Sequence, residues 1–311
     1  MIKGIDISEM NGVIDFEKVK KSGINFVMIR ASFGRKKEDK ALHRNAKACI
    51  KNKIPFGFYY YSYAINEETA KEEVLFFLKT INTYKEYIKY PLVIDMEDSD
   101  GYKKERNAIS KENLTKIVKI ATETIRGQGF IPMVYANKDY FDNYLDEEEL
   151  KNVPKWIAWW NEKATIDKAK YTIWQYKSTG IVEGIGTKVD MNESFFDYEK
   201  YTNYLHNIIK INEIKLLTGL QDLTIQFLTC YKWGQDLIDK IYDRLQGKKL
   251  KLLDNYELET MKIVVKEEYK LEEKTIEFMS NYIYAEELFT KLFRAICEES
   301  KKWKKKNLIQ K

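Results

Sequence analysis

The sequence PLVIDMED, residues 91–98, places an uninterrupted apolar run directly before a cluster of acids. Such a run is typical of a strand buried on both faces, as in a parallel sheet. Side chains two residues apart share one face of a strand, so Asp95 and Glu97 should point the same way, about 6 to 7 Å apart. Burying unpaired carboxylates is costly, and neighbouring like charges raise one pKa, so the pair suggests a functional site. The alternative is a strand that simply ends at solvent.

Size and charge narrow the class of protein. The chain has 311 residues, of which 44% are hydrophobic, enough for one large domain and a smaller one. The formal net charge is only +5, from 53 basic and 48 acidic side chains. We therefore expect no nucleic-acid partner, and at most a mild attraction to an anionic surface such as a bacterial wall.

Cysteine usage and hydropathy exclude several kinds of site. Cys49, Cys230 and Cys297 lie far apart and lack metal-ligand spacing, so we expect no disulfide framework, no metal and no cofactor. The chain begins directly with a predicted strand, without a basic segment and an apolar run typical of a signal peptide. No window of about 18 apolar residues occurs, so we expect no membrane span.

Proline and glycine divide the chain into two parts. All four prolines and eleven of the fourteen glycines precede residue 190, whereas residues 211–311 contain only Gly219, Gly234 and Gly247. We predict a boundary near residues 200–212, with a first domain over residues 1–205 and a second over residues 212–311.

Strand and helix patterns alternate through the first domain. Asp15, Asn66 and Ser110 are suited to cap helices that follow them. Short links between alternating units predict a parallel sheet, and eight strands in about 200 residues predict that it closes into an irregular TIM-like (β/α) barrel with about five helices. The strands are expected at residues 3–8, 25–32, 55–63, 91–98, 131–136, 155–160, 171–176 and 187–191, and the helices at 15–22, 40–53, 66–81, 110–127 and 138–145.

Closure of the barrel has a chemical consequence. The last strand should lie beside the first, which makes Asp190 a neighbour of Asp6, with Asp95 and Glu97 across the opening. Active sites of such barrels lie at the C-terminal ends of the strands, and we expect all four acids at or near such ends. The sequence thus predicts a cluster of carboxylates at one mouth.

The second part reads as a smaller all-α domain of three or four helices. Apolar residues recur at intervals of three and four, as in Ile214, Leu217, Leu220, Leu223 and Phe227, which predicts a small bundle. The domain could bind a partner, or serve folding or homo-oligomerisation. A lysine-rich end, residues 301–306, could touch an anionic polymer, or could simply be solvated.

A set of short motifs in residues 1 to about 200 resembles the glycoside hydrolase family 25 lysozymes, the muramidases of phage endolysins and bacterial autolysins. Single motifs of this kind occur by chance, but the ordered set is specific. The matching pieces are GIDIS (4–8), RASFG (30–34), Asp39, Asn45, GFYYYSYA (57–64), DME (95–97), VY (134–135), WIA (156–158), WQY (174–176), GIVEG (180–184) and VDMN (189–192).

The resemblance implies hydrolysis of the β-1,4 bond between N-acetylmuramic acid and N-acetylglucosamine in peptidoglycan. In this reading Glu97 is the general acid, and Asp95 orients and polarises it. Asp190 and Asp6 then stabilise positive charge or position the substrate's 2-acetamido group, while a protein nucleophile or activated water stays open. Tyr59, Tyr61, Tyr135 and Trp160 have the parity to face the mouth, where they either bind sugar or pack the barrel.

For a lysozyme of this kind, the partner of the helical domain, residues 212–311, would be the cell wall, and its lysine-rich end could touch anionic wall polymers. The resemblance also implies a location. A lysozyme of this kind would be made in the bacterial host cytoplasm and reach the wall after release, by holin-type export or lysis. The alternative is a non-catalytic protein that binds wall glycan on a degenerate barrel. A third reading is an intracellular structural or regulatory protein whose helical half carries the function.

Overall fold

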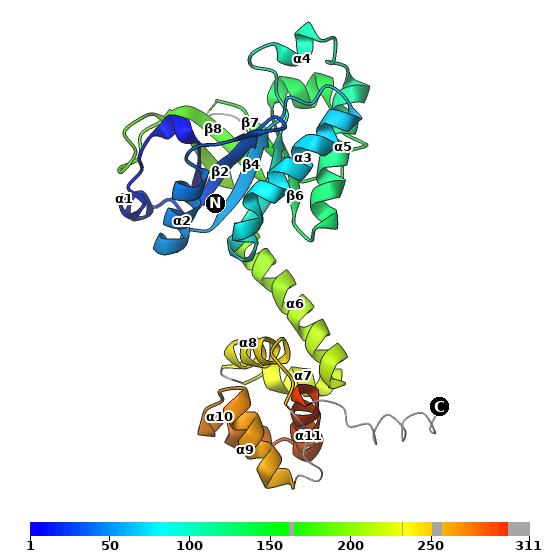
Figure 1. Ribbon diagram of the computed structural model, residues 1–311. Helices are drawn as coiled ribbons and strands as arrows, with labels where there is room; N and C mark the ends of the chain where they lie inside the picture. Colours follow the sequence, from blue (N-terminus) through cyan, green and yellow to red (C-terminus); the bar gives the residue numbers. More distant parts are fainter. Residues whose placement is uncertain (162–164, 232, 251–256, 298–311) are drawn as a thin grey trace. The chain divides into compact units, whose positions relative to one another are not determined.

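The computed structural model describes residues 1–161, 165–231, 233–250 and 257–297 (Figure 1). The chain forms two compact units, Met1–Thr202 and Asn203–Lys311. Each unit has its own hydrophobic core. Helix α6 (Tyr198–Thr218) begins in the first unit and continues into the second, so the expected boundary at residues 200–212 falls within a helix.

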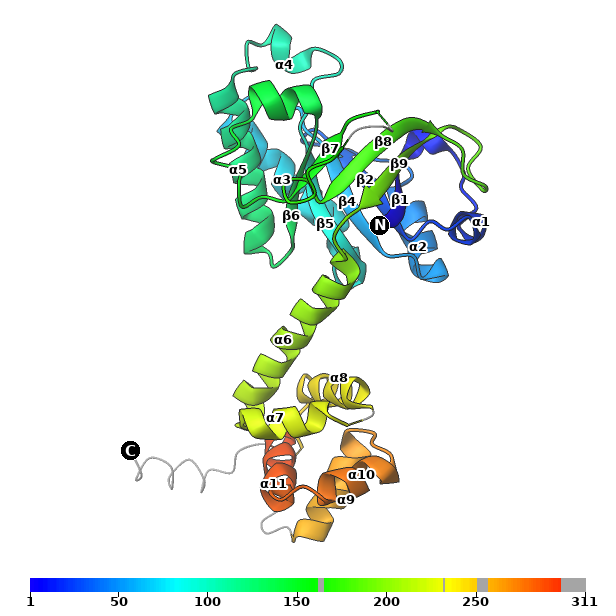
Figure 2. The same cartoon turned by 180° about the vertical axis from the view of Figure 1, so that it is seen from behind.

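Eight strands of the first unit close into a barrel, which confirms the predicted fold class (Figures 1 and 2). Around the barrel the order is β1, β2, β4, β5, β6, β7, β8 and β9, and β9 returns to β1. A short strand, β3 (Lys37–Glu38), is added to β2. The barrel strands are β1 (Ile2–Ile7), β2 (Phe26–Phe33), β4 (Phe56–Tyr61), β5 (Ile88–Asp95), β6 (Pro132–Asn137), β7 (Lys155–Ala158), β8 (Ile173–Gly180) and β9 (Val189–Ser194).

The closing strand runs against the others. Neighbouring strands from β1 through β8 pair in parallel, but β9 is antiparallel to both β8 and β1. The prediction of a wholly parallel sheet is therefore wrong for β9. The segment between Gly180 and Val189 is too short for the crossover of a dozen or more residues that a parallel return needs, so the chain turns back as a hairpin.

Local capping chemistry starts the helices as predicted. The Asp15 carboxylate accepts hydrogen bonds from the N–H groups of Glu17 and Lys18. The Asn66 and Ser110 side chains cap the helices that begin at Glu67 and Lys111. The α-helices of this unit before β6 are α1 (Phe16–Lys21), α2 (Leu42–Asn52), α3 (Glu67–Ile81), α4 (Tyr102–Glu105) and α5 (Lys111–Gly127), and the 3-10 helices are η1 (Glu9–Asn11) and η2 (Asn82–Tyr87).

Helices cover only part of the barrel. Helices α3 and α5 lie side by side against the sheet (Figure 1). The helix predicted over 138–145 is a five-residue π-helix, η3 (Tyr140–Tyr144). Within the described residues the later strands β8 and β9 have no covering helices, as the sequence predicts (Figure 2).

The barrel interior is packed with large side chains. The rings of Phe26 and Tyr90 stack at a centroid distance of 4.4 Å. Two glycines leave room for them: a Cβ on Gly4 would lie 2.3 Å from the Phe26 ring, and one on Gly57 would lie 2.8 Å from the Tyr90 Cβ. This filling leaves the strand ends as the place where polar chemistry can gather.

The second unit contains more helices than predicted. Breaks at 269–272 and 281–284 divide the apolar pattern of this stretch, so the unit exceeds the three or four helices predicted for it. The Tyr269 hydroxyl donates to the carbonyl oxygen of Leu292 (2.9 Å), which joins two of the pieces. After α6 the described helices are α7 (Asp222–Thr229), α8 (Gly234–Leu245), α9 (Leu258–Glu268), α10 (Glu273–Ser280) and α11 (Ala285–Ile296).

The sequence predicts no membrane span and a lysine-rich end. Over the described ranges, no helix combines the length and apolar character that a membrane crossing requires. The lysine-rich segment 301–306 lies outside the described residues.

Candidate active site

The first acidic pair joins the two strands that close the barrel. Asp6 on β1 and Asp190 on β9 are directly opposed in the antiparallel register. Because β9 is reversed, Asp190 lies near the start of its strand, and the expectation that it lies near a C-terminal strand end is wrong. The reversal nevertheless brings Asp190 to the barrel end where the parallel strands finish, so the two acids meet as predicted.

The second acidic pair lies at the end of strand β5 and just beyond it. Asp95 is the last residue of β5 and is 4% exposed, whereas Glu97, two residues later, is half-buried. A hydrogen bond joins the two side chains. Electrostatic coupling links the pairs, because the charge of Asp6 raises the pKa of both Asp95 and Glu97. The four acids therefore form one cluster, drawn from three strands.

Two buried amides hold Asp6. The Gln175 Nε2 group on β8 donates to Asp6 Oδ2 (2.9 Å), and Asn192 Nδ2 on β9 donates to the same oxygen (2.8 Å). Both amide side chains are almost fully buried, at 3% and 0% exposure. Neutral donors at this distance favour the ionised form of the carboxylate.

Aromatic donors fix the orientation of these amides. Trp156 Nε1 donates to Asn192 Oδ1 (2.8 Å). The Tyr135 hydroxyl and Trp160 Nε1 both donate to Gln175 Oε1 (3.0 Å each). Since each amide oxygen is already occupied, each NH₂ group must turn toward Asp6.

Burial raises the pKa of both Asp6 and Asp190, and repulsion by neighbouring carboxylates adds to the rise for Asp190. Burial raises the pKa of Asp6 to about 6, and the hydrogen bonds from Asn192 and Gln175 oppose this rise. Burial, followed by the charges of Asp6 and Glu97, raises the pKa of Asp190 to about 8. Both carboxyls therefore keep their protons to higher pH than ordinary aspartic acids do.

A cation acts on the second pair. Burial, then the charge of Glu97, raises the pKa of Asp95, and burial, then the charge of Asp6, raises that of Glu97. The Lys103 ammonium lowers the pKa of both carboxyls. Asp95 Oδ1 is buried without a hydrogen-bond partner, a costly arrangement that favours a proton on the pair.

Of the four aromatic residues predicted to face the mouth, three are half-buried tyrosines and the fourth, Trp160, is mostly exposed. Tyr59, Tyr61 and Tyr135 are half-buried, and the charges of Asp95 and of at least one other member of the cluster act on each hydroxyl. Trp160 lies beyond β7, not on a strand as expected, and is 62% exposed. Its hydrogen bond to Gln175 nevertheless links it to the Asp6 side of the cluster.

Sequence reasoning did not single out the residues that support the acids. In the sequence, Gln175 and Asn192 appear only within the WQY and VDMN motifs. The alternation of side chains along β8 and β9 is the signal that could have found them. Lys103 lies in a charged stretch, KKER (103–106), that reads as surface. Over the described ranges, no group of three or more His, Cys, Asp or Glu side chains is arranged to hold a metal ion.

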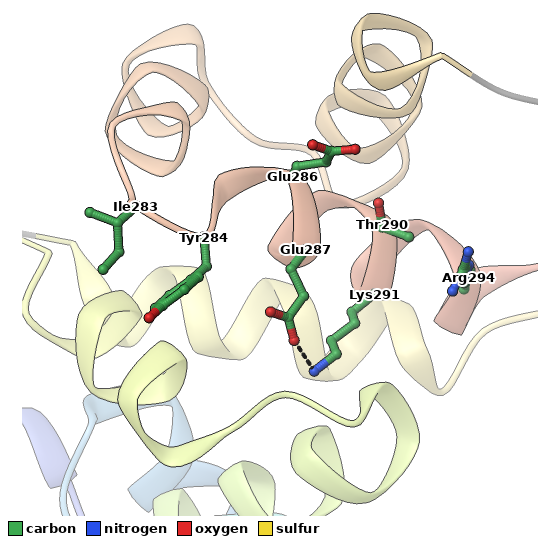
Figure 3. A pocket seen from close by; sticks show the side chains of 7 residues that line it. All are labelled: Ile283, Tyr284, Glu286, Glu287, Thr290, Lys291 and Arg294. Carbon is green, nitrogen blue, oxygen red and sulfur yellow. Dashed lines mark ion pairs between the residues drawn. The ribbon is translucent and has the colours of Figure 1, made fainter.

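The helical unit has a separate open hollow of about 450 Å³ beside α11 (Figure 3). Tyr284, Glu287 and Lys291 point to one side of the helix, and Glu286 points to the other. Lys291 pairs with Glu287 (2.5 Å) and also donates to the Gly219 carbonyl oxygen (2.8 Å). The hollow is lined by Ile283, Tyr284, Glu286, Glu287, Thr290, Lys291 and Arg294.

Known proteins resemble the barrel unit. An autolytic lysozyme of Clostridium acetobutylicum is 30% identical over 193 residues, which cover 62% of this chain and 55% of that protein. The modular autolysin LytC of Streptococcus pneumoniae, solved in complex with a synthetic peptidoglycan ligand, matches with a TM-score of 0.55 and 28% identity, over 61% of this chain and 46% of that one. A family 25 glycosyl hydrolase from Bacillus anthracis matches with a TM-score of 0.55 and 26% identity, over 65% of this chain and 93% of that one.

These similarities concern the barrel unit. The chain spans about half the length of the first two relatives, 55% and 46%. The sequence profile of the glycosyl hydrolases of family 25 matches residues 5–185, more than half of the chain and nearly all of the barrel. The chain belongs to the glycosyl hydrolases of family 25.

Proposed function

We propose that this protein is a peptidoglycan hydrolase that cleaves the β-1,4 bond between N-acetylmuramic acid and N-acetylglucosamine. The observation that carries the proposal is the hydrogen-bonded Asp95–Glu97 pair, coupled to Asp6 and Asp190 at one end of the barrel. The names of the relatives, an autolytic lysozyme and an autolysin with a peptidoglycan ligand, support the choice of substrate.

Glu97 is the proposed general acid. The leaving oxygen of a glycosidic bond must receive a proton, so the donor must stay protonated near neutral pH. Burial and the charges of Asp6 and Asp100 raise the pKa of Glu97, which favours the protonated form. Glu97 is also half-buried, so substrate can reach it, whereas Asp95 is buried beside it and is placed to orient and polarise it.

Asp6 and Asp190 are proposed to act on the sugar ring. An ionised Asp6 would stabilise the positive charge of the oxocarbenium-like transition state. A protonated Asp190 can donate a hydrogen bond, which suits positioning of the 2-acetamido group for attack on the neighbouring carbon. Attack by a protein nucleophile or by an activated water is the other route to the same product.

The aromatic residues supply the proposed sugar contacts. A sugar offers flat apolar faces edged by hydroxyls, and aromatic rings with polar tips match both features. Tyr59, Tyr61 and Tyr135 lie close enough to the acids for their hydroxyls to sense the carboxylate charges. Trp160 offers the most exposed ring of the four, at 62%.

Loss of turbidity of purified bacterial walls tests this function. Glu97→Gln removes the proton donor with little change in shape, so lysis should fall by about 100- to 10,000-fold. Glu193→Gln is the matched control, because Glu193 is also half-buried but lies on β9 opposite Lys3, nearer the other end of the barrel. Undiminished lysis by Glu97→Gln would contradict the assignment. Wall binding without lysis by the unaltered chain would instead favour a glycan-binding protein.

The helical unit is proposed to tether the enzyme to the wall. Tethering raises the local concentration of an insoluble substrate without new catalytic contacts. The hollow beside α11 combines a half-exposed aromatic ring, Tyr284, with charged side chains, which suits a polar polymer. Co-sedimentation with walls should be weaker for Glu97→Gln/Tyr284→Ala than for Glu97→Gln alone. Equal sedimentation would favour a folding or oligomerisation role for this unit.

A further inference from the structure

Lys103 is a buried cation beside the acidic cluster. It lies in α4, the short helix that follows the loop after β5, and its side chain is fully buried. The turn that buries it is held by Asp98, whose carboxylate accepts hydrogen bonds from the N–H groups of Lys103 (2.7 Å) and Lys104 (3.0 Å). Because a buried lysine is costly, its retention here calls for a specific reason.

The ammonium of Lys103 joins two loops of the mouth. Lys103 Nζ donates to the carbonyl oxygen of Glu97 (2.6 Å) and to that of Ser62, which directly follows β4. Ser62 is itself fixed, since its hydroxyl donates to Glu73 on α3 (2.7 Å) and its N–H donates to the carbonyl oxygen of Asp95 (3.1 Å). The backbone that carries Glu97 is thus anchored to the neighbouring strand by one side chain.

We propose that Lys103 is a positioning residue of the acidic site. Its ammonium fixes the loop that carries Glu97 and supplies the positive charge that the Asp95–Glu97 pair faces. This inference rests on the proposed function, and it assigns to that site a role that lies outside the four acids.

The groups that face Lys103 explain what its charge does. They are Asp95 at the end of β5, Glu97 and Asp98 in the loop, Glu73 on α3, and the ring of Tyr61 on β4, 5.6 Å from Nζ.

Burial alone would favour protonation of both Asp95 and Glu97, which would leave the pair without negative charge. The nearby cation opposes this by lowering the pKa of each carboxyl. The pair can then keep one proton to donate and one charge to stabilise the transition state.

The pH dependence of wall lysis tests this electrostatic role. In Lys103→Gln and Lys103→Met the cation is lost, so Glu97 should hold its proton to higher pH, and the alkaline limb of kcat/KM should move upward by about one pH unit or more. A purely structural role would lower the rate at every pH without moving the limb. Two variants are used because glutamine and methionine differ in polarity, and folding of both is checked by circular dichroism.

Lys155 provides a matched control in the same barrel. It is 4% exposed, and its Nζ likewise donates to two backbone carbonyl oxygens, those of Leu150 (2.8 Å) and Val153 (3.3 Å). Lys155 lies at the start of β7, at the end of the barrel opposite the acids. Lys155→Gln should cost stability to a similar degree but leave the alkaline limb where it is.

Carbon-13 NMR titration of the side-chain carboxyls separates this inference from the proposed function, because it requires no turnover. The Glu97 resonance should titrate at higher pH in Lys103→Gln than in the unaltered chain. If walls are lysed but neither the limb nor this resonance moves, the role of Lys103 is wrong while the hydrolase stands. If the resonance moves but walls are never lysed, the hydrolase is wrong while the coupling to Lys103 stands.

Discussion

The two acidic pairs at the barrel mouth are stabilised in different ways. Asp6, opposite Asp190, is held by the neutral amides of Gln175 and Asn192. The Asp95–Glu97 pair instead faces the buried ammonium of Lys103. Neutral donors stabilise a carboxylate without adding charge, whereas a cation adds a positive charge that favours a negative charge on the pair. One site can therefore contain both a proton donor and an ionised carboxylate.

This contrast explains how similar side chains could serve different roles. Each of the four carboxyls has a raised pKa, and burial is the largest cause for each. The four carboxyls differ in the other groups that act on their pKa values. Asp6 accepts hydrogen bonds from amides, Asp95 and Glu97 face a cation, and Asp190 faces other carboxylates. Environments that push pKa values apart are the usual basis of acid and base assignments.

Removing an amide from the Asp6 pair should produce the larger effect. Asn192→Leu deletes one of the two donors to Asp6, so the pKa of Asp6 should rise above about 6. The acidic limb of kcat/KM should then move to higher pH, and the rate at pH 6 should fall by about 10- to 100-fold, as for a hydrogen bond to a charged group worth about 1.5 to 3 kcal/mol. The Lys103 variants move the opposite limb, so pH profiles of the two variants measure the contrast directly.

Asn113→Leu is the control for this experiment. Asn113 on α5 donates through its amide to the carbonyl oxygens of Ile65 (3.0 Å) and Ala108 (2.8 Å), and neither partner is a carboxylate. It should lower stability without moving either limb. An acidic limb that stays in place in Asn192→Leu would mean that the amides do not set the charge of Asp6.

A smaller effect is expected on stability from Asp190→Asn. The folded-state pKa of Asp190, about 8, lies above the model-compound value of 3.8, so the folded state binds this proton more tightly. The resulting stabilisation is present at low pH and is lost as the pH rises through about 8. Asp190→Asn should therefore show a smaller fall in Tm between pH 5 and pH 9, by about 2 to 4 °C, since partial exposure limits the effect to about 1 kcal/mol. Parallel Tm curves for the two proteins would contradict the raised pKa.

The sequence was sufficient to predict the barrel and the cluster of acids. An apolar run that ends in DME predicts a buried strand with acids at its end, and β5 ends at Asp95. The pairing of the first and last strands follows from closure, and Asp6 and Asp190 are register partners. The first feature follows from the order of apolar and acidic residues in one short segment, and the second follows from the number of strands in the barrel.

Strand direction and burial of single polar residues were beyond such patterns. The alternation of apolar and polar residues in the VDMN motif does not show in which direction the strand runs. Only the short segment before Val189 could have indicated a hairpin. Lys103 lies beside Lys104 in the chain, yet one is buried and the other exposed. That difference arises from the turn fixed by Asp98, a contact made only once the loop has folded.

The reversal of β9 determines where the chain leaves the barrel. Because β9 starts at the acids and runs away from them, Phe195 and Thr202 emerge at the opposite end, where they hydrogen-bond to Thr172 and Lys89 near the beginnings of β8 and β5. A final strand in the other direction would have delivered the chain to the end of the barrel that carries the acids. Whatever follows β9 therefore starts away from those acids.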